Sequence, residues 1–210
     1  ITILNGINNP LLLKIRGKDG KLYKQIIKGN KDDLRQDAVM QQLFVLSSKL
    51  LLKTNPDLSI RSYKVIPISP ICGIIEFVEG SISIQDYLAQ QYIDETSQKT
   101  YFKGAHQRYR ISKITYEQAY IEFRKASKFF YNMPNEKNAS KLTAVFKEIR
   151  TKFRPVFRFF FLENFKNQAD WFLSRIRYSR HTATNSMVGY ILGIGDRHLN
   201  NILIDKKNGE

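Results

Sequence analysis

The pattern of apolar residues changes once along the chain, near residue 78, and this change limits the folds that the chain can adopt. Before that point, short apolar runs separated by glycine and proline turns predict strands, with one long segment at helical spacing. After it, helical spacing dominates. The sequence therefore predicts an α+β protein with two lobes, a sheet with one helix in residues 1–79 and a mainly helical part in 80–210. Ligands favour the seam between such lobes.

The first region opens with a predicted hairpin, because Gly17 and Gly20 lie between two apolar runs and signal a tight turn. Either Asp32 or Asp33 is placed to act as the N-cap of the helix that follows. The predicted strands are 11–15, 22–27, 60–68 and 73–78, and the predicted helix is 33–53. The single cysteine, Cys72, lies among apolar neighbours and is expected to be a small buried side chain in a chain from a reducing compartment.

The second region is predicted to be mainly helical, because the strand-rich pattern stops near residue 78. The helices are expected at 116–130, 141–149, 155–165, 169–179 and 182–192, with a surface loop at 132–140. Gly193 and Gly195 are placed to end the last helix. Residues 196–201 then form a polar loop before a short apolar strand at 202–204, so this polar loop is held between two rigid elements.

The charge of the chain favours acidic partners but does not predict a nucleic-acid module. Lys and Arg number 34 against 19 Asp and Glu, which gives a net charge of +15, yet the basic residues are scattered. They fit solvated faces or a site for phosphorylated or acidic partners. No apolar run approaches the roughly 20 residues of a membrane-spanning helix. Ile1 is not an initiator residue, so we expect a piece of a longer protein.

The polar loop concentrates groups suited to phosphoryl transfer. Protein kinases place an Asp that orients or accepts the proton of the attacking hydroxyl five positions before an Asn that ligands Mg²⁺. Asp196 and Asn201 have this spacing. The alternative is an Asx-turn loop whose side chains cap the local backbone.

Two further features suggest contacts with phosphates. Lys28 ends a strand just before a helix start that is rich in Asp, and Asp37 is placed to hold its ammonium group. A solvated Lys beside helix-capping Asp residues explains the same pattern. The turn from Gly17 to Gly20 can offer backbone N–H groups to phosphates, although most turns of this kind are only turns.

Four segments carry a resemblance to a known family. They are Asp32–Gln42, Tyr63–Pro67, Gly104–Arg110 and Met187–His198. In this order they resemble the phosphatidylinositol 3-kinase-related protein kinases, in particular the branch that acts in the DNA-damage response, and the likeness runs through nearly the whole chain. Members of this family have Asp-Arg-His where ordinary protein kinases have His-Arg-Asp. Residues 196–198 of this chain also read Asp-Arg-His. The resemblance implies the bilobal kinase-like fold.

The resemblance also implies roles for individual residues. Asp196 would orient or deprotonate the substrate hydroxyl, His198 would stabilise charge on the transferring phosphoryl group, and Asn201 would bind Mg²⁺. Lys28 would contact the ATP phosphates with support from Asp37. The remaining ATP-binding residues would be the turn Gly17, Lys18, Asp19 and Gly20, the hinge Glu76, Phe77 and Val78, and the adenine-pocket residues Tyr63 and Leu203. One extra residue before Asp32 makes Lys31 a competitor for Lys28.

The function implied by the resemblance is an ATP- and Mg²⁺-dependent serine/threonine protein kinase, with Mn²⁺ as a possible substitute ion. It would phosphorylate Ser or Thr followed by Gln in DNA repair, checkpoint and telomere signalling in the nucleus. The parent would form a homodimer, bind a DNA-break sensor complex of the MRN type, contact DNA only indirectly and avoid membranes. The second metal ligand, the Asp of Asp-x-Gly, and the activation loop would follow Glu210, so the chain alone should be catalytically incomplete. The alternatives are a phosphoinositide lipid kinase and a non-catalytic basic scaffold or nucleic-acid-binding module.

Overall fold

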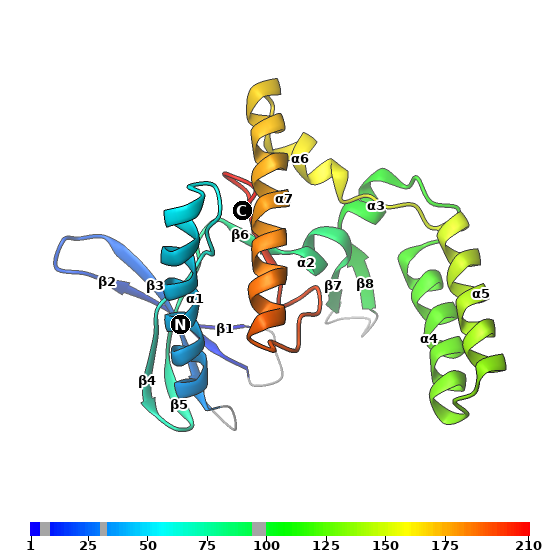
Figure 1. Ribbon diagram of the computed structural model, residues 1–210, viewed down its shortest axis with the longest axis horizontal. Helices are drawn as coiled ribbons and strands as arrows, with labels where there is room; N and C mark the ends of the chain where they lie inside the picture. Colours follow the sequence, from blue (N-terminus) through cyan, green and yellow to red (C-terminus); the bar gives the residue numbers. More distant parts are fainter. Residues whose placement is uncertain (5–8, 30–32, 94–99) are drawn as a thin grey trace. The chain divides into compact units, whose positions relative to one another are not determined.

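The computed structural model describes residues 1–4, 9–29, 33–93 and 100–210 (Figure 1). The chain forms two compact units that interleave along the sequence. The first unit comprises Ile1–Ser81, Leu173–Gly195 and Lys207–Glu210, and the second comprises Ile82–Phe172 and Asp196–Lys206. Each unit is described by itself below. Nowhere in the described ranges is there a helix whose length and apolar content suit a membrane crossing.

The first unit is built on a five-stranded antiparallel sheet with the order β1-β2-β3-β5-β4. The strands are β1 (Thr2–Ile3), β2 (Leu11–Arg16), β3 (Leu22–Gly29), β4 (Val65–Ser69) and β5 (Cys72–Glu76). The predicted hairpin is confirmed, because β2 and β3 pair from Leu11 with Ile27 to Arg16 with Leu22 across the Gly17–Gly20 turn.

Helix α1 (Leu34–Thr54) packs against one face of this sheet. It begins where the sequence predicts, because the Asp33 carboxylate accepts a hydrogen bond from the N–H of Arg35. Asp32, the alternative N-cap, lies outside the described residues. Leu34 is 1% exposed, and a Cβ at Gly73 would lie 2.9 Å from its Cδ1 and 2.6 Å from the Ile66 carbonyl oxygen. Only glycine at residue 73 therefore lets α1 lie this close to β5.

Two predictions for the first unit are wrong in detail. The strand expected at 60–68 instead runs from Val65 to Ser69, because the backbone N–H groups of Ile60 and Tyr63 bond to α1 side chains. The N–H of Ile60 donates to Ser48 Oγ at 3.2 Å, and that of Tyr63 donates to Gln41 Oε1 at 3.1 Å. Cys72 is half-buried and not fully enclosed, because it lies at the end of β5 where the β4 register shifts.

The second unit contains most of the remaining elements. They are β6 (Ser81–Ser83, at the junction), α2 (Ile84–Ala89), β7 (Gln90–Ile93), β8 (Thr100–Lys103), α3 (Ala105–Tyr109), α4 (Tyr116–Asn132), α5 (Glu136–Lys152), α6 (Arg158–Asn164) and β9 (Leu203–Asp205). Its core is aromatic. The rings of Tyr87 and Phe160 meet edge to face at 5.2 Å, and Phe160 is completely buried between Phe157 and Phe161.

The mainly helical region also contains short strands that the sequence pattern does not predict, namely β6 and the β7–β8 hairpin. These elements and α2 are only three to six residues long, too short to show a period in the sequence. The predicted range of the surface loop, 132–140, is also longer than the loop in the structure. Helix α5 begins at Glu136, because the Asn135 side chain accepts from the N–H of Asn138 at 2.8 Å and caps the helix.

Helix α7 (Gln168–Ile191) is one continuous helix where two were predicted. The prediction leaves a gap at residues 180–181, but here Thr184 Oγ1 donates to the Arg180 carbonyl oxygen and the His181 ring bonds outside the helix. The helix ends as predicted at Gly193, which has φ 66°. The N–H of Ile194 donates to Gly189 O and that of Gly193 to Tyr190 O, which is a Schellman motif.

Gly104 is expected to be indispensable for the second unit. Its φ of 139° and ψ of −174° lie in a region open essentially to glycine, and a Cβ there would lie 2.6 Å from the Leu88 carbonyl oxygen. We expect Gly104→Ala to lower the free energy of unfolding by about 2 kcal/mol or more. Denaturant unfolding would measure this, with Gly189→Ala as the control. Gly189 is helical with open space beside it, so alanine there should be neutral or stabilising by about 1 kcal/mol. Equal losses in the two variants would contradict the prediction.

Candidate active site

The polar loop follows the C-terminus of α7 and leads into β9. Asp196 has φ 55°, a left-handed conformation that Asp tolerates better than most residues. This conformation turns the chain directly after Gly195. Asn201 Nδ2 donates to the Asp196 carbonyl oxygen at 2.8 Å and to Asp196 Oδ2 at 2.9 Å. The two residues that the spacing singled out are therefore in direct contact.

His198 lies against the same carboxylate. Its Nε2 is 3.6 Å from Asp196 Oδ1, and its Nδ1 accepts from the N–H of Asn200 at 3.2 Å. Because Nδ1 accepts, the ring proton of the neutral form belongs on Nε2, facing Asp196. The N–H of Asn201 donates to the His198 carbonyl oxygen at 2.9 Å, which closes the turn. The side chain of Asp196 is 78% exposed, so the three groups face solvent.

The first turn of α2 holds the polar loop in place. The N–H groups of Ile84 and Gln85 donate to the carbonyl oxygens of Ile202 and Leu199 at 3.0 and 3.1 Å. These amides are among the four that a helix N-terminus leaves without an internal partner. The next amide, of Asp86, donates to Ser83 Oγ at 2.9 Å. A helix that the sequence analysis missed is thus the support of the loop, and its one sequence signal is the Ser83-x-x-Asp86 cap.

Lys28 lies in the first unit, at the end of β3. Its Nζ is 3.9 Å from Asp37 Oδ2 on α1, so the predicted pair is present. Lys28 pairs with Gly73 in the sheet, and paired residues share a face, so Lys28 lies on the face that α1 covers. Lys31, the competitor, lies outside the described residues.

The hinge residues follow the end of β5. Glu76 Oε2 accepts from the N–H of Lys64 at 2.9 Å, which anchors the hinge to the start of β4. The N–H of Phe77 donates to Lys24 O at 3.3 Å and continues the ladder, so alternation places Phe77 on the Lys28 face. Lys24 Nζ lies 5.5 Å from the Phe77 ring centre. Val78 O accepts from Ser81 Oγ at 2.7 Å.

The turn between β2 and β3 is stabilised by its own groups. The Asp19 carboxylate accepts from Tyr23 Oη at 2.8 Å and from the N–H of Lys21 at 3.1 Å, and these bonds lower the pKa of Asp19. The amides of Gly17 and Gly20 also bond within the turn, at 2.8 and 3.0 Å. Asp19 is therefore a structural residue of the hairpin, and Lys18 is the member of the turn whose amide has no such internal bond in the described ranges.

The remaining predicted residues occupy different places. Tyr63 is half-buried and its backbone is fixed to Gln41 of α1. Leu203 lies in β9 and is half exposed. Asn201 turns its amide nitrogen to Asp196, so its Oδ1 remains the atom suited to a cation. A carboxylate and an amide oxygen are the hard ligands that Mg²⁺ takes together with substrate phosphates. Asn201 Oδ1 is therefore an oxygen ligand of the kind that fits Mg²⁺.

A polar cluster in the second unit escaped the sequence analysis. Arg108 binds both oxygens of Glu163, at 2.9 and 3.0 Å from Nη2, and Tyr109 Oη donates to Glu163 Oε1 at 2.7 Å. Burial alone would raise the pKa of Glu163, but these bonds outweigh it and lower the pKa. The cluster borders a cavity of about 610 Å³ that also includes Lys103 and Lys206 but none of Asp196, His198 or Asn201. It ties α3 to α6.

His106, in the same segment, is half-buried among aromatic rings. Its ring stacks on Phe153 with 4.2 Å between ring centres, and its Nδ1 is buried with no hydrogen-bond partner among the described residues. Burial lowers the pKa of His106 to about 4.

Comparisons with known proteins agree with this architecture. Residues 23–210 match the family model for phosphatidylinositol 3- and 4-kinase. The chain is 43% identical to serine/threonine-protein kinase ATM of Arabidopsis thaliana and 39% identical to serine/threonine-protein kinase TEL1 of Saccharomyces cerevisiae. These matches cover 100% and 98% of the chain but only 5% and 7% of the relatives.

Solved structures give the same result. The chain matches a structure described as the FAT and kinase domain of CtTel1 with a TM-score of 0.81 and 38% identity, over 99% of the chain and 14% of that protein. A Tel1 kinase dimer matches with a TM-score of 0.73 and 36% identity, over 98% of the chain and 8% of that protein.

The fold and the family model together define a kinase domain of the phosphatidylinositol 3- and 4-kinase family, and the chain belongs to this family. Within it, the chain resembles the ATM and Tel1 serine/threonine kinases over its whole length. The predicted fold class and the predicted resemblance are confirmed.

The depressed pKa of His106 predicts a loss of stability in mild acid. A histidine with a pKa near 6.5 unfolded and about 4 folded stabilises the fold fully above pH 6.5, and this contribution is lost as the pH falls toward 4. We expect His106→Phe, which keeps the stacked ring and cannot be protonated, to lose less stability over this window than the original chain. The free energy of unfolding measured at several pH values would test this. Parallel curves for the two proteins would show that another group causes the acid sensitivity.

Proposed function

We propose that this chain is the nucleotide- and metal-binding part of an ATP-dependent serine/threonine protein kinase. The observation that carries the proposal is the direct contact of Asp196, His198 and Asn201 in a loop fixed by α2 and by the end of α7. The names of the relatives support a protein kinase over a lipid kinase or a non-catalytic scaffold. Because the chain spans a small share of those relatives, the activity of the whole protein is part of the proposal.

The proposed chemistry follows from the positions of the groups in the loop. Asp196 orients the hydroxyl of a Ser or Thr substrate and accepts its proton at the carboxylate. The proton on His198 Nε2 offers a hydrogen bond to charge that develops on the transferred phosphoryl group. Asn201 Oδ1 would hold Mg²⁺, which would neutralise phosphate charge when bound.

The first unit supplies the nucleotide contacts in this proposal. Lys28, held by Asp37, binds phosphate oxygens, and Lys18 contributes the turn amide. The backbone of Glu76 and Val78 meets the adenine edge, while Phe77 offers its ring to the base from the Lys28 face. Tyr63 and Leu203 are assigned to the adenine pocket by family likeness alone.

The biological setting is proposed from the relatives. We infer a substrate preference for Ser or Thr followed by Gln, and a role in DNA repair, checkpoint and telomere signalling in the nucleus. Two Tel1 structures that the chain matches are described as dimers, which supports a homodimer of the whole protein. A DNA-break sensor complex of the MRN type is its proposed partner. ATP with Mg²⁺ or Mn²⁺ is the proposed cofactor pair.

Replacing Asp196 tests the assignment of the loop. In the full-length protein, Asp196→Asn should lower kcat on a Ser-Gln peptide by on the order of 10²- to 10⁴-fold, because the amide cannot accept the substrate proton. Asp170→Asn, at an exposed carboxylate in the first turn of α7, is the control and should keep the activity. Radiolabelled phosphate transfer is the measurement. Undiminished turnover by Asp196→Asn would remove this residue from the mechanism.

The phosphate-contacting lysine is tested by comparing Lys28 with Lys31. Lys28→Met should reduce kcat/KM for ATP by on the order of 100-fold, because a cation aimed at developing phosphate charge is lost. Lys31→Met should stay within a few-fold, because the proposal places the phosphate contact at Lys28, which pairs with Asp37. Steady-state kinetics at varied ATP would measure both variants. A larger loss in Lys31→Met than in Lys28→Met would assign the phosphate contact to Lys31 and not to Lys28.

A further inference from the structure

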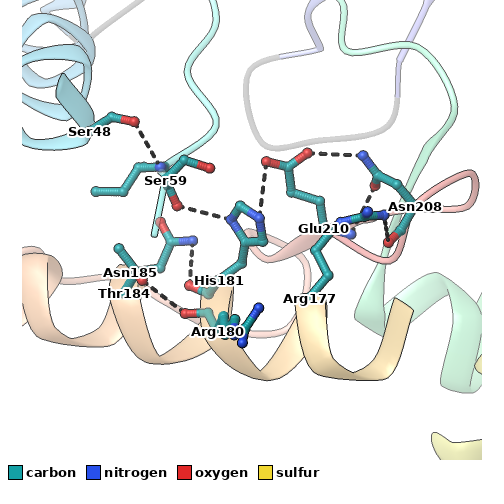
Figure 2. A network of polar contacts seen from close by, with 10 residues as sticks. Ser48, Ser59, Arg177, Arg180, His181, Thr184, Asn185, Asn208 and Glu210 are labelled. Carbon is teal, nitrogen blue, oxygen red and sulfur yellow. Dashed lines mark hydrogen bonds and ion pairs between the residues drawn. The ribbon is translucent and has the colours of Figure 1, made fainter. Parts of the chain in front are cut away.

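Two side chains of α7 reach the short turn that follows β9. Arg177 Nη1 donates to the Asn208 carbonyl oxygen at 3.1 Å, and His181 Nε2 lies 3.5 Å from Glu210 Oε1 (Figure 2). Arg177 and His181 are one helical turn apart and therefore lie on one face of α7. The turn is itself rigid, because Asn208 Nδ2 donates to Glu210 Oε2 and Asn208 Oδ1 accepts from the Glu210 N–H, both at 3.0 Å.

The second nitrogen of His181 binds a different segment. Nδ1 is 2.9 Å from the Ser59 carbonyl oxygen, and because a carbonyl only accepts, Nδ1 carries a hydrogen (Figure 2). Nε2 therefore forms its ion pair with Glu210 in the protonated ring, in which both nitrogens carry hydrogens. The next residue, Ile60, donates its N–H to Ser48 of α1. His181 is 8% exposed, and burying a polar ring costs free energy unless its nitrogens have partners. One imidazole thus connects α7, the segment after α1 and the turn after β9, all in the first unit.

The polar loop lies, in the sequence, between the residues that these contacts join. His181 precedes the loop in α7, and Glu210 follows it after β9, so the bridge between them closes a stretch of chain that contains the loop. Both flanks belong to the first unit, while residues 196–206 belong to the second. A loop whose two flanks are fastened has fewer accessible conformations than one fastened at a single flank.

We infer that His181 is a positioning residue for phosphoryl transfer, because its contact with Glu210 joins the two flanks of the polar loop and its contact with Ser59 holds α7, the first of these flanks. The inference rests on the proposed kinase function of the loop. Arg180 also binds Asp57 in the segment after α1, so this segment keeps one contact with α7 when His181 is replaced. Variants of His181 should therefore fold.

The test compares three replacements in the full-length protein. His181→Ala removes both contacts and should lower kcat by on the order of 10- to 100-fold, since small displacements of reacting groups have effects of this size. KM for ATP should stay within about threefold, because the nucleotide contacts are untouched. His181→Gln places an amide near the Nε2 position and should recover most of kcat. His181→Asn matches the Nδ1 position, keeps only the Ser59 contact and should remain low.

Ser186→Ala, at an exposed position of the same helix, is the control and should not change kcat. Hydrogen exchange of the amides in residues 196–201 should rise in His181→Ala and not in Ser186→Ala. Unchanged kcat in His181→Ala overturns the inference. An equal loss of kcat in the Gln and Asn variants, in step with their melting temperatures, also overturns it, because this result would mean a structural role alone. Should the Ala variant not fold, the Gln and Asn pair decides the outcome. An active Asp196→Asn protein would instead overturn the proposed function.

Discussion

Two hydrogen bonds from the first turn of α2 connect the stability of that helix to the shape of the polar loop. The amides of Ile84 and Gln85 need acceptors because no residue of α2 precedes them, and the loop carbonyls at Leu199 and Ile202 supply these acceptors. A six-residue helix is too short to be stable by itself. The helix therefore depends on the loop for its N-terminal partners, and the loop depends on the helix for its path. Neither forms correctly without the other.

The same dependence explains the unusual backbone at Asp196. A left-handed residue other than glycine costs on the order of 1 kcal/mol or more, so the surrounding structure must enforce it. The Schellman end of α7 fixes the chain before Asp196, and the two bonds from Asn201 fix it afterwards. The strain is thus confined to the residue whose carboxylate the proposed chemistry uses. A group held in this way loses little freedom when a substrate binds.

Sequence reasoning succeeded where a short local pattern decides the structure. The β2–β3 hairpin follows from the glycines of its turn, α1 from its capping Asp33, and the contact of Asp196 with Asn201 from their spacing. It failed where distant partners decide. Residues 60–64 read as a strand but are fixed to Ser48 and Gln41, which no local pattern reveals. The predicted helices leave a gap at residues 180–181, because the Ser59 and Glu210 partners of His181 are far away in the sequence.

The exposure of the polar loop indicates what kind of contribution it makes. The side chains of Asp196 and His198 are 78% and 53% exposed, and charges that face water interact weakly because the solvent screens them. The residues on either side of the loop are enclosed, with Ile204 and Asp205 of β9 and Thr184 of α7 all buried. The loop itself therefore does not supply a strong electric field, and such a field must come from a bound nucleotide, its metal ion and the substrate. The loop contributes geometry, and the buried segments on either side of it determine that geometry.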